Sequence, residues 1–188
     1  AYISTIEHLL SAIYSYGIDN VRVVLDGPEV PVMDGSSASF CMMLDEAGIR
    51  KLDATKHILV IKKEVEVQEG NKFARVTPSL KPSYHFTIDF SHPSIGKQEY
   101  HFEFSRKNFI EEISRARTFG FLKDVQMLRS RGLALGGSMD NAVVMDETKI
   151  LNPEGLRFSN EFVRHKILDA IGDLALLGTP FLGDYTSY

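Results

Sequence analysis

The polar and apolar positions of the chain predict helices near its two ends. The first helix is predicted between a cap at Ser4 or Thr5 and an end at Gly17, because apolar residues recur there at helical spacing: Ile6, Leu9, Leu10 and Ile13. A second helix is predicted over residues 37–47, with Gly48 as its stop. A helix that begins almost at the first residue is typical of a piece cut from a longer domain.

Alternating polar and apolar residues replace the helical period in the middle of the chain. Two hairpins are predicted, one turning at residues 69–72 and the other at residues 91–98. Shorter strands are predicted at residues 21–26 and 142–146. The hairpins indicate an antiparallel sheet.

Helical patterns return in the second half, at residues 106–114, 121–130 and 161–177. Because strands are grouped before helices, the order favours an α+β layered fold over regular βαβ alternation. The polar stretch 50–57 is the best candidate for a boundary between two domains.

Composition limits the possible functions. The 188 residues are 44% hydrophobic and 24% charged, which is ordinary for a globular protein with a real core. A net charge of −4 argues against a general nucleic-acid binder. The single cysteine, Cys41, excludes an internal disulfide framework, and no apolar run reaches the roughly 18 residues of a membrane span. The expected location is the cytoplasm.

Polar residues align on one face of the last predicted helix. His165, Asp169 and Asp173 recur every four residues, and Lys166 shares their face. The opposite face is apolar: Ile167, Leu168, Ile171, Leu174 and Ala175. A solvated polar stripe is the ordinary interpretation of such a face. The alternative is a metal site, because His and carboxylate one turn apart suit Zn²⁺.

A metal site needs a third ligand, and His8 is a candidate because Glu7 precedes it. The ordinary interpretation is that Ser4 and Glu7 form a capping box and that His8 is a polar residue near a helix end. Taken with the last helix, the pair offers two histidines, an aspartate and a neighbouring glutamate. That is the composition of a catalytic zinc site.

Seven strings in this order resemble the UDP-3-O-acyl-N-acetylglucosamine deacetylases, the zinc amidases of lipid A biosynthesis. The strings are "STIEHLLSA", "GIDN", "PEVPVMDGSSASF", "SRARTFGF", "RGLALGGSMDNAVV", "LNPEGLRF" and "EFVRHKILDAIGDL". The resemblance implies a two-domain α+β sandwich, each domain a small, mainly antiparallel sheet layered with helices. Residues 1–52 would be the end of a truncated first domain, and residues 57–188 most of the second.

The resemblance also implies roles for the central residues. His8, His165 and Asp169 would bind Zn²⁺, with Fe²⁺ as an alternative metal. Glu7 would be the general base, and Thr118 would donate a hydrogen bond to the oxyanion.

Substrate contacts follow from the same resemblance. Lys166 would meet the diphosphate, and Asp173 would lie behind the site and orient a histidine. Lys72, Asp89 and Phe90 would lie near the uridine and sugar. An apolar passage for the acyl chain would be lined by Phe121, Leu122, Val125, Ala134, Gly137 and Val144, although ordinary helix-core packing explains about half of these as well.

The expected activity is therefore removal of the N-acetyl group from a UDP-3-O-acyl-N-acetylglucosamine, a small-molecule UDP-sugar lipid substrate, by a monomer. The family pattern continues beyond Tyr188 into a segment with another histidine, so this chain is not expected to be active alone. Two other classes remain open: a sugar-nucleotide or lipid-binding module without catalysis, and a different zinc hydrolase such as a peptidase.

Overall fold

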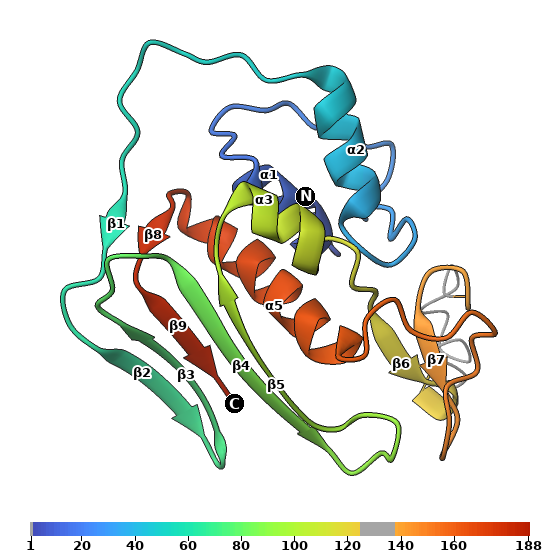
Figure 1. The fold of residues 1–188 in the computed structure, drawn as a ribbon. Coiled ribbons are helices and arrows are strands. Elements are labelled where there is room, and N and C mark those ends of the chain that lie inside the picture. The colour runs from blue at the N-terminus through green and yellow to red at the C-terminus, as the bar shows by residue number, and fades with distance from the viewer. Residues whose placement is uncertain (1, 125–137) are drawn as a thin grey trace.

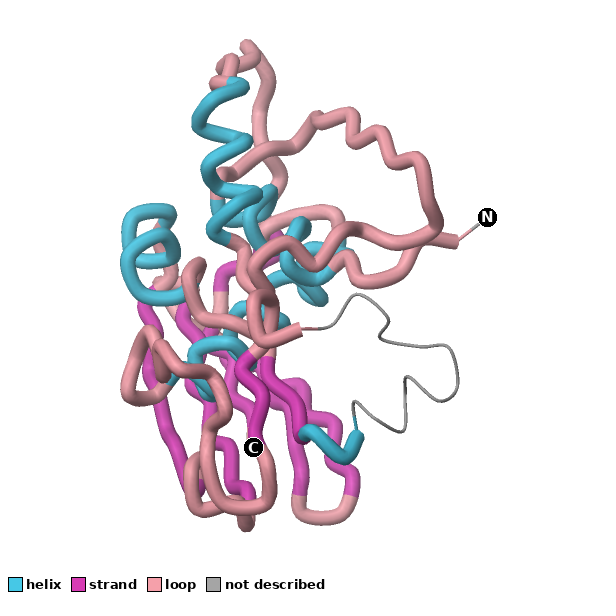
Figure 2. Tube along the Cα trace, turned by 90° about the vertical axis from the view of Figure 1, so that its right-hand side faces the viewer, coloured by secondary structure: helices cyan, strands magenta, loops and turns pink. Residues whose placement is uncertain are grey.

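The computed structural model describes residues 2–124 and 138–188 of the chain. Its centre is a five-stranded sheet with α5, Glu161–Leu174, packed on β4 and β5 (Figure 1). The strands follow the order β2 (Val65–Glu69), β3 (Lys72–Thr77), β9 (Asp184–Ser187), β4 (Ser83–Phe90) and β5 (Gly96–Glu103). Most of the helical segments lie above the strands in the side view (Figure 2), so the expected α+β class is confirmed.

Both predicted hairpins are present. The β2–β3 hairpin closes at Glu69 and Lys72, and the β4–β5 hairpin closes at Phe90 and Gly96. Strand β9 was not predicted, because its sequence DYTS is short and has no apolar alternation. It lies between the hairpins, antiparallel to β3 and parallel to β4, so the sheet is mixed but mainly antiparallel.

Helix α5 connects the sheet to the remaining helices. One face of α5 buries Ile167, Leu168 and Ile171 completely, as the helical period predicts. Helix α1, Glu7–Ser15, packs against α5, and α2, Ala38–Ala47, packs against α1. One apolar cluster runs through these helices to the sheet, and its most deeply buried aromatic members are Tyr84, Phe102 and Phe109.

The predicted start of the first helix is wrong. Helix α1 begins at Glu7 with Ile6 at the N-cap position and no side-chain cap. The hydroxyl of Ser4 donates instead to the carbonyl of Pro28, and that of Thr5 donates to the Glu29 carboxylate. The capping-box interpretation is therefore wrong, because the two hydroxyls bind Pro28 and Glu29 in the loop before α2.

The predicted strand at residues 21–26 is also absent, since these residues pair with no strand of the described chain. Val21, Val23 and Val24 are exposed. Alternation alone does not make a strand, because a strand also needs a neighbour for its backbone hydrogen bonds.

Two parallel strands form a separate small layer beside the start of α5: β6, Phe119–Phe121, and β7, Val143–Met145. The prediction of a helix starting at Phe121 is wrong at that residue, which ends β6, but it is confirmed at residues 122–124, which are helical. Residues 125–130 of that predicted helix lie outside the described residues. A second apolar cluster of Ile95, Val143, Met145 and Phe162 joins this layer to the β4–β5 hairpin and α5.

Short elements complete the described chain: β1 (Leu59–Val60) parallel to β8 (Phe181–Leu182), α3 (Arg106–Asn108), the π-helical turn η1 (Phe109–Ile113) and the 3-10 turn η2 (Ala175–Leu177). The predicted connector 50–57 contains no helix or strand. The division into two domains at that connector stays a prediction. Among the described residues, no helix has the length and apolar content needed to cross a bilayer.

Candidate metal centre

The packing of α1 against α5 brings three ligating side chains together. His8 lies in the first turn of α1, and His165 and Asp169 lie one turn apart on α5. One ligating atom from each lies within 4.8 Å of the other two. The Oδ1 atom of Asp169 is 3.2 Å from Nε2 of His165 and 3.7 Å from Nε2 of His8. Among the described residues, this is the one group of three or more ligating side chains close enough to hold a metal ion.

The His165 ring is fixed by a hydrogen bond on the side away from Asp169. It is 1% exposed, and its Nδ1 lies 3.0 Å from the backbone carbonyl oxygen of Ala116. Because a carbonyl only accepts, Nδ1 must donate, and in the neutral ring Nε2 then carries the lone pair. The same Nε2 faces Asp169. The His8 ring stands nearly perpendicular to that of His165, with centroids 5.0 Å apart.

This arrangement fits a small divalent cation. An imidazole lone pair and a carboxylate oxygen repel at 3.2 Å unless a proton or a metal ion lies between them. Zinc bonds of 2.0–2.2 Å in tetrahedral geometry separate neighbouring ligand atoms by about 3.4 Å. The two distances from Asp169 Oδ1, 3.2 and 3.7 Å, bracket that value.

Asp169 is held in its ionised form. Burial would raise its pKa, but the charge of a protonated His165 ring and the hydrogen bond that its Nε2 then donates act in the opposite direction. His8 and Lys166 add to this effect, and the pKa lies well below its usual range. The Lys166 ammonium donates to the second carboxylate oxygen at 3.0 Å. A metal ion would therefore meet a charged ligand without first displacing a proton from it.

Asp173 lies one turn beyond Asp169. Its pKa is raised, first by burial and then by the negative charges of Asp169 and Glu7. The three carboxylates therefore share one small region. The Ala116 carbonyl orients the His165 ring, whereas Nδ1 of His8 is buried and has no hydrogen-bond partner among the described residues. That Asp173 orients a histidine stays a prediction.

Two buried hydroxyls hold the backbone of His8. The Oγ atoms of Ser11 and Ser37 each lie 2.8 Å from the His8 carbonyl oxygen and 2.6 Å from each other. Ser37 is the N-cap residue of α2, and its amide donates to the carbonyl of Ser114. The position of His8 thus depends on α2 as well as on α1.

Thr118 follows the segment that fixes His165. Its amide donates to the Gly35 carbonyl at 2.7 Å, and its carbonyl accepts from the Val143 amide at 2.8 Å. The backbone at Thr118 is thereby held between the loop before α2 and strand β7.

Phe119 connects the metal centre to a pocket. Its ring contacts those of Phe162, Phe90 and His165, with centroids 4.9, 5.8 and 6.4 Å apart. The Lys166 ammonium lies 5.4 Å from the ring centroid of Phe119. The aromatic side chain therefore lies between the candidate metal ligands and Phe90.

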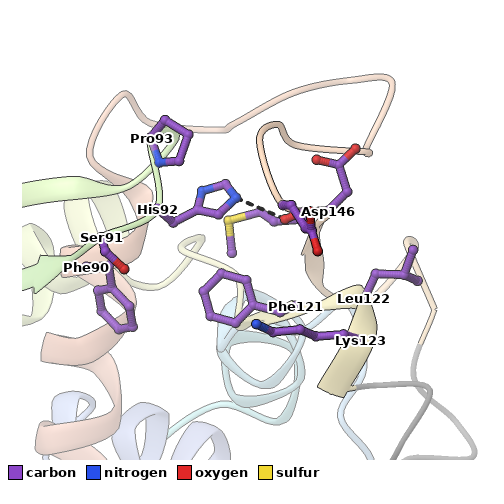
Figure 3. A pocket seen from close by; sticks show the side chains of 10 residues that line it. Phe90, Ser91, His92, Pro93, Phe121, Leu122, Lys123 and Asp146 are labelled. Atoms are coloured by element: carbon purple, nitrogen blue, oxygen red, sulfur yellow. Dashed lines mark hydrogen bonds between the residues drawn. The ribbon is translucent and has the colours of Figure 1, made fainter.

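The pocket beyond Phe119 has a volume of about 530 Å³. Figure 3 shows it between the turn after β4 and the β6–β7 layer. Its wall combines apolar and polar side chains: Phe90, Ser91, His92, Pro93, Phe121, Leu122, Lys123, Met145, Asp146 and Glu147. His92 is fixed there by a contact of 3.0 Å between its Nε2 and the Asp146 carbonyl oxygen.

The structure brings some predicted substrate residues together and leaves others apart. Phe90, Phe121 and Leu122 all line the pocket beyond Phe119. Lys72 lies at the tip of the β2–β3 hairpin, and Asp89 is exposed on β4 opposite Lys97, so neither lines it. Val144 is buried in β7. Three further predicted passage residues lie outside the described residues: Val125, Ala134 and Gly137.

Sequence patterns did not single out several residues that build this centre. Ser11 and Gly172 are small residues on helix faces, with no chemical signature of their own. Ser37 was one of two predicted caps of the second helix, with Ser36, and it is the N-cap residue of α2, but no pattern indicated its contact with His8. Arg117 and Glu161 form a buried ion pair beside the centre. They are 44 residues apart in the chain, so no local sequence pattern indicates that they pair.

Comparisons with a family model and with individual curated proteins indicate the same family. The family model for UDP-3-O-acyl N-acetylglycosamine deacetylase matches residues 1–188. A UDP-3-O-acyl-N-acetylglucosamine deacetylase of Campylobacter hominis is 71% identical over 187 residues, which is 100% of this chain and 64% of the relative. The proteins of the same name from Campylobacter fetus subsp. fetus and Campylobacter jejuni subsp. jejuni serotype O:2 are 70% and 69% identical, covering 63% and 64% of their lengths. The chain thus spans slightly less than two thirds of these curated relatives.

Proposed function

Because the chain belongs to the UDP-3-O-acyl N-acetylglycosamine deacetylase family, we propose that it is the metal-binding part of such an enzyme. The reaction is hydrolysis of the N-acetyl amide of a UDP-3-O-acyl-N-acetylglucosamine, with release of acetate, in lipid A biosynthesis. The observation that carries the proposal is the convergence of His8, His165 and Asp169, with Glu7 directly before His8. A binding module would not need a carboxylate base beside a metal ligand.

Zinc is the metal that this ligand set suits best. Two imidazoles and one carboxylate leave a fourth position open, which is typical of catalytic zinc sites. The chemistry that zinc supplies there is a bound water with a pKa near 7 and Lewis-acid polarisation of a carbonyl.

Glu7 is the proposed general base. It would accept the proton of the attacking water and later return it to the leaving amine. Its position supports this role, because its charge raises the pKa of Asp173 on the adjoining turns of α5. The first residue of α1 also shares the helix end with His8, so the base and the ligand move together.

Thr118 and Lys166 are proposed to meet the negative charges of the reaction. A hydroxyl at Thr118 would donate to the oxyanion of the tetrahedral intermediate. The ammonium of Lys166, 41% exposed and adjacent to the ligand His165, would meet the substrate diphosphate. A local cation of this kind would be needed on a chain of net charge −4.

The pocket beside Phe119 is proposed to receive substrate. Phe90 would lie near the uridine, and Phe121 and Leu122 would contact the acyl chain. The lining of the pocket supports these two roles, because it combines the aromatic rings of Phe90 and Phe121 with the polar side chains of His92 and Lys123. The roles of Lys72, Asp89 and Val144 near the substrate stay predictions.

The test is hydrolysis by the full-length protein of an acylated UDP-N-acetylglucosamine, compared with a peptide amide. The nucleotide sugar should release acetate and the peptide should not react. Glu7→Gln should lower kcat by at least 100-fold and leave the zinc content unchanged. Exposed Glu69, on β2, provides the control Glu69→Gln, which should retain full activity.

Zinc content tests the ligands separately. His165→Gln should lose zinc, whereas His85→Gln on the sheet should retain it. Zinc content unchanged in His165→Gln would overturn the ligand assignment, and peptide hydrolysis at a comparable rate would favour another zinc hydrolase. Zinc binding without either hydrolysis would favour a binding module.

A further inference from the structure

Arg117 is a buried arginine whose guanidinium is fully engaged. Its side chain is 2% exposed. Nε donates to Glu161 at 2.9 Å, Nη1 to Glu154 at 2.6 Å, and Nη2 to the carbonyl of Gly155 at 2.7 Å. Burying a charge costs several kcal/mol unless its partners compensate. An apolar residue would fill this space without that cost, so the cation needs an explanation.

Glu161, the partner of Arg117, accepts hydrogen bonds from backbone amides as well as from the arginine side chain. It is completely buried and is the first residue of α5. Its Oε1 accepts from the backbone amide of Arg117 at 2.9 Å, and its Oε2 accepts from that of Arg157 at 2.6 Å. One carboxylate thus joins the start of α5 to two separate segments of chain.

The pair spans the hydrogen bond that orients His165. Ala116, whose carbonyl accepts from the His165 ring, directly precedes Arg117. Thr118 directly follows it. On the other side of the pair, Glu161 lies one helical turn before His165. Any shift between the two segments changes the distance between the His165 ring and its acceptor.

We propose that Arg117 and Glu161 are positioning residues of the metal centre. They fix the start of α5 against residues 116–118, and so set the orientation of the His165 ring and the place of the Thr118 hydroxyl. This inference rests on the proposed function for the roles of His165 and Thr118. Neither member of the pair belongs to the candidate ligand group or lines the pocket beside Phe119. Their effect is transmitted through Ala116 and α5.

The test uses full-length protein with variants of graded severity. Arg117→Lys keeps the charge but cannot reach Glu161, Glu154 and Gly155 at once. Glu154→Gln is milder, because Glu154 is 54% exposed and contributes one of the three arms. The matched control is Phe102→Leu, a buried residue of β5 that packs against Tyr84 on the next strand. It lowers stability without touching residues 116–118.

Three measurements are made below the unfolding temperature of every variant. They are the zinc dissociation constant by chelator competition, the visible spectrum of the Co²⁺-substituted protein, and the histidine ¹⁵N spectrum of the metal-free protein. Arg117→Lys should weaken zinc binding about tenfold or more, with a changed Co²⁺ spectrum and loss of the hydrogen-bonded Nδ1–H signal of His165. Glu154→Gln should show the same changes at smaller amplitude.

Phe102→Leu should lose stability and keep all three signals. The inference is overturned if Arg117→Lys and Glu154→Gln keep wild-type metal affinity and spectra, or if they change no more than Phe102→Leu does at equal loss of stability. None of these readouts requires deacetylation. If the wild-type protein binds zinc but hydrolyses no nucleotide sugar, the proposed function fails while the positioning role is still tested.

Discussion

A Cβ atom placed on Gly172 would lie 2.1 Å from the carbonyl oxygen of Glu7 and 2.7 Å from its carbonyl carbon. Both neighbours are backbone atoms at the start of α1, so no side-chain rotation relieves the overlap. Gly172 is three residues after Asp169 on α5. The absence of a side chain there allows α1 to approach α5 closely enough for His8 to reach Asp169.

Gly172→Ala should therefore separate the two helices. The expected results are a loss of stability of at least 1–3 kcal/mol and zinc binding weakened more than tenfold. Thermal unfolding and chelator competition measure the two effects. The control is Gly27→Ala, because a Cβ at Gly27 has no atom within 4 Å and the backbone there is not left-handed. Wild-type zinc affinity in Gly172→Ala would show that the close approach is unnecessary.

The sequence predicted His8, His165 and Asp169 as one candidate ligand set, but it did not predict the contacts that hold these side chains together. Helical periodicity placed His165 and Asp169 on one face, and the Glu7–His8 pair offered a third candidate ligand. Periodicity could not decide whether that face was solvated, because burial depends on what packs against it. In the structure, α1 covers the face and His165 is 1% exposed.

Long-range contacts account for the other differences. Gly172 and Ser37 contact residues of α1 that are distant in sequence, and no local pattern encodes such pairs. Strand β9 forms only because β3 and β4 leave a place between them. The predicted strand at residues 21–26 had the right alternation and found no neighbour among the described residues.

Ser37→Ala should disturb His8 through its backbone. The variant removes one of the two hydroxyls at the His8 carbonyl and leaves a buried polar group with fewer partners. A stability loss of about 1–3 kcal/mol is expected. Denaturant unfolding measures it, with Ser39→Ala, a partly exposed position of α2, as the control. Equal stability of the two variants would mean that Ser11 alone holds the carbonyl.

Stability in acid should depend on Asp34. Burial tends to raise its pKa, but hydrogen bonds from Arg157 and Ser36 and the charge of Arg157 outweigh burial and lower it. A carboxylate with a lowered folded-state pKa stabilises the protein above its unfolded pKa of about 3.9, and that contribution is lost as the pH falls through the folded value. Asp34→Asn should thus be less stable than wild type at pH 7, and the difference should shrink below about pH 4.

Unfolding measured from pH 7 to pH 3 checks this expectation. Asp53→Asn, at an exposed position of the connector, should follow the wild-type curve. A constant difference between Asp34→Asn and wild type across this range would assign the loss to packing rather than to the charge. The Asp34–Arg157 ion pair, at 2.7 Å, would then make no measurable electrostatic contribution to the free energy of unfolding.

The pocket beside Phe119 should discriminate acyl chains. Phe121 lines it, and its ring lies 5.5 Å from that of His92. Removing the ring in Phe121→Ala takes away apolar contact from the part of the substrate that lies against it. For a full-length enzyme, kcat/KM for a long-chain substrate should fall about 10- to 100-fold, and that for a short-chain substrate should change much less.

The control is Phe73→Ala, because the Phe73 ring is stacked on Tyr188 in another part of the sheet. This variant should lower kcat/KM for both substrates equally or not at all. Equal losses for both chain lengths in Phe121→Ala would place the acyl group elsewhere and leave this pocket to another part of the substrate.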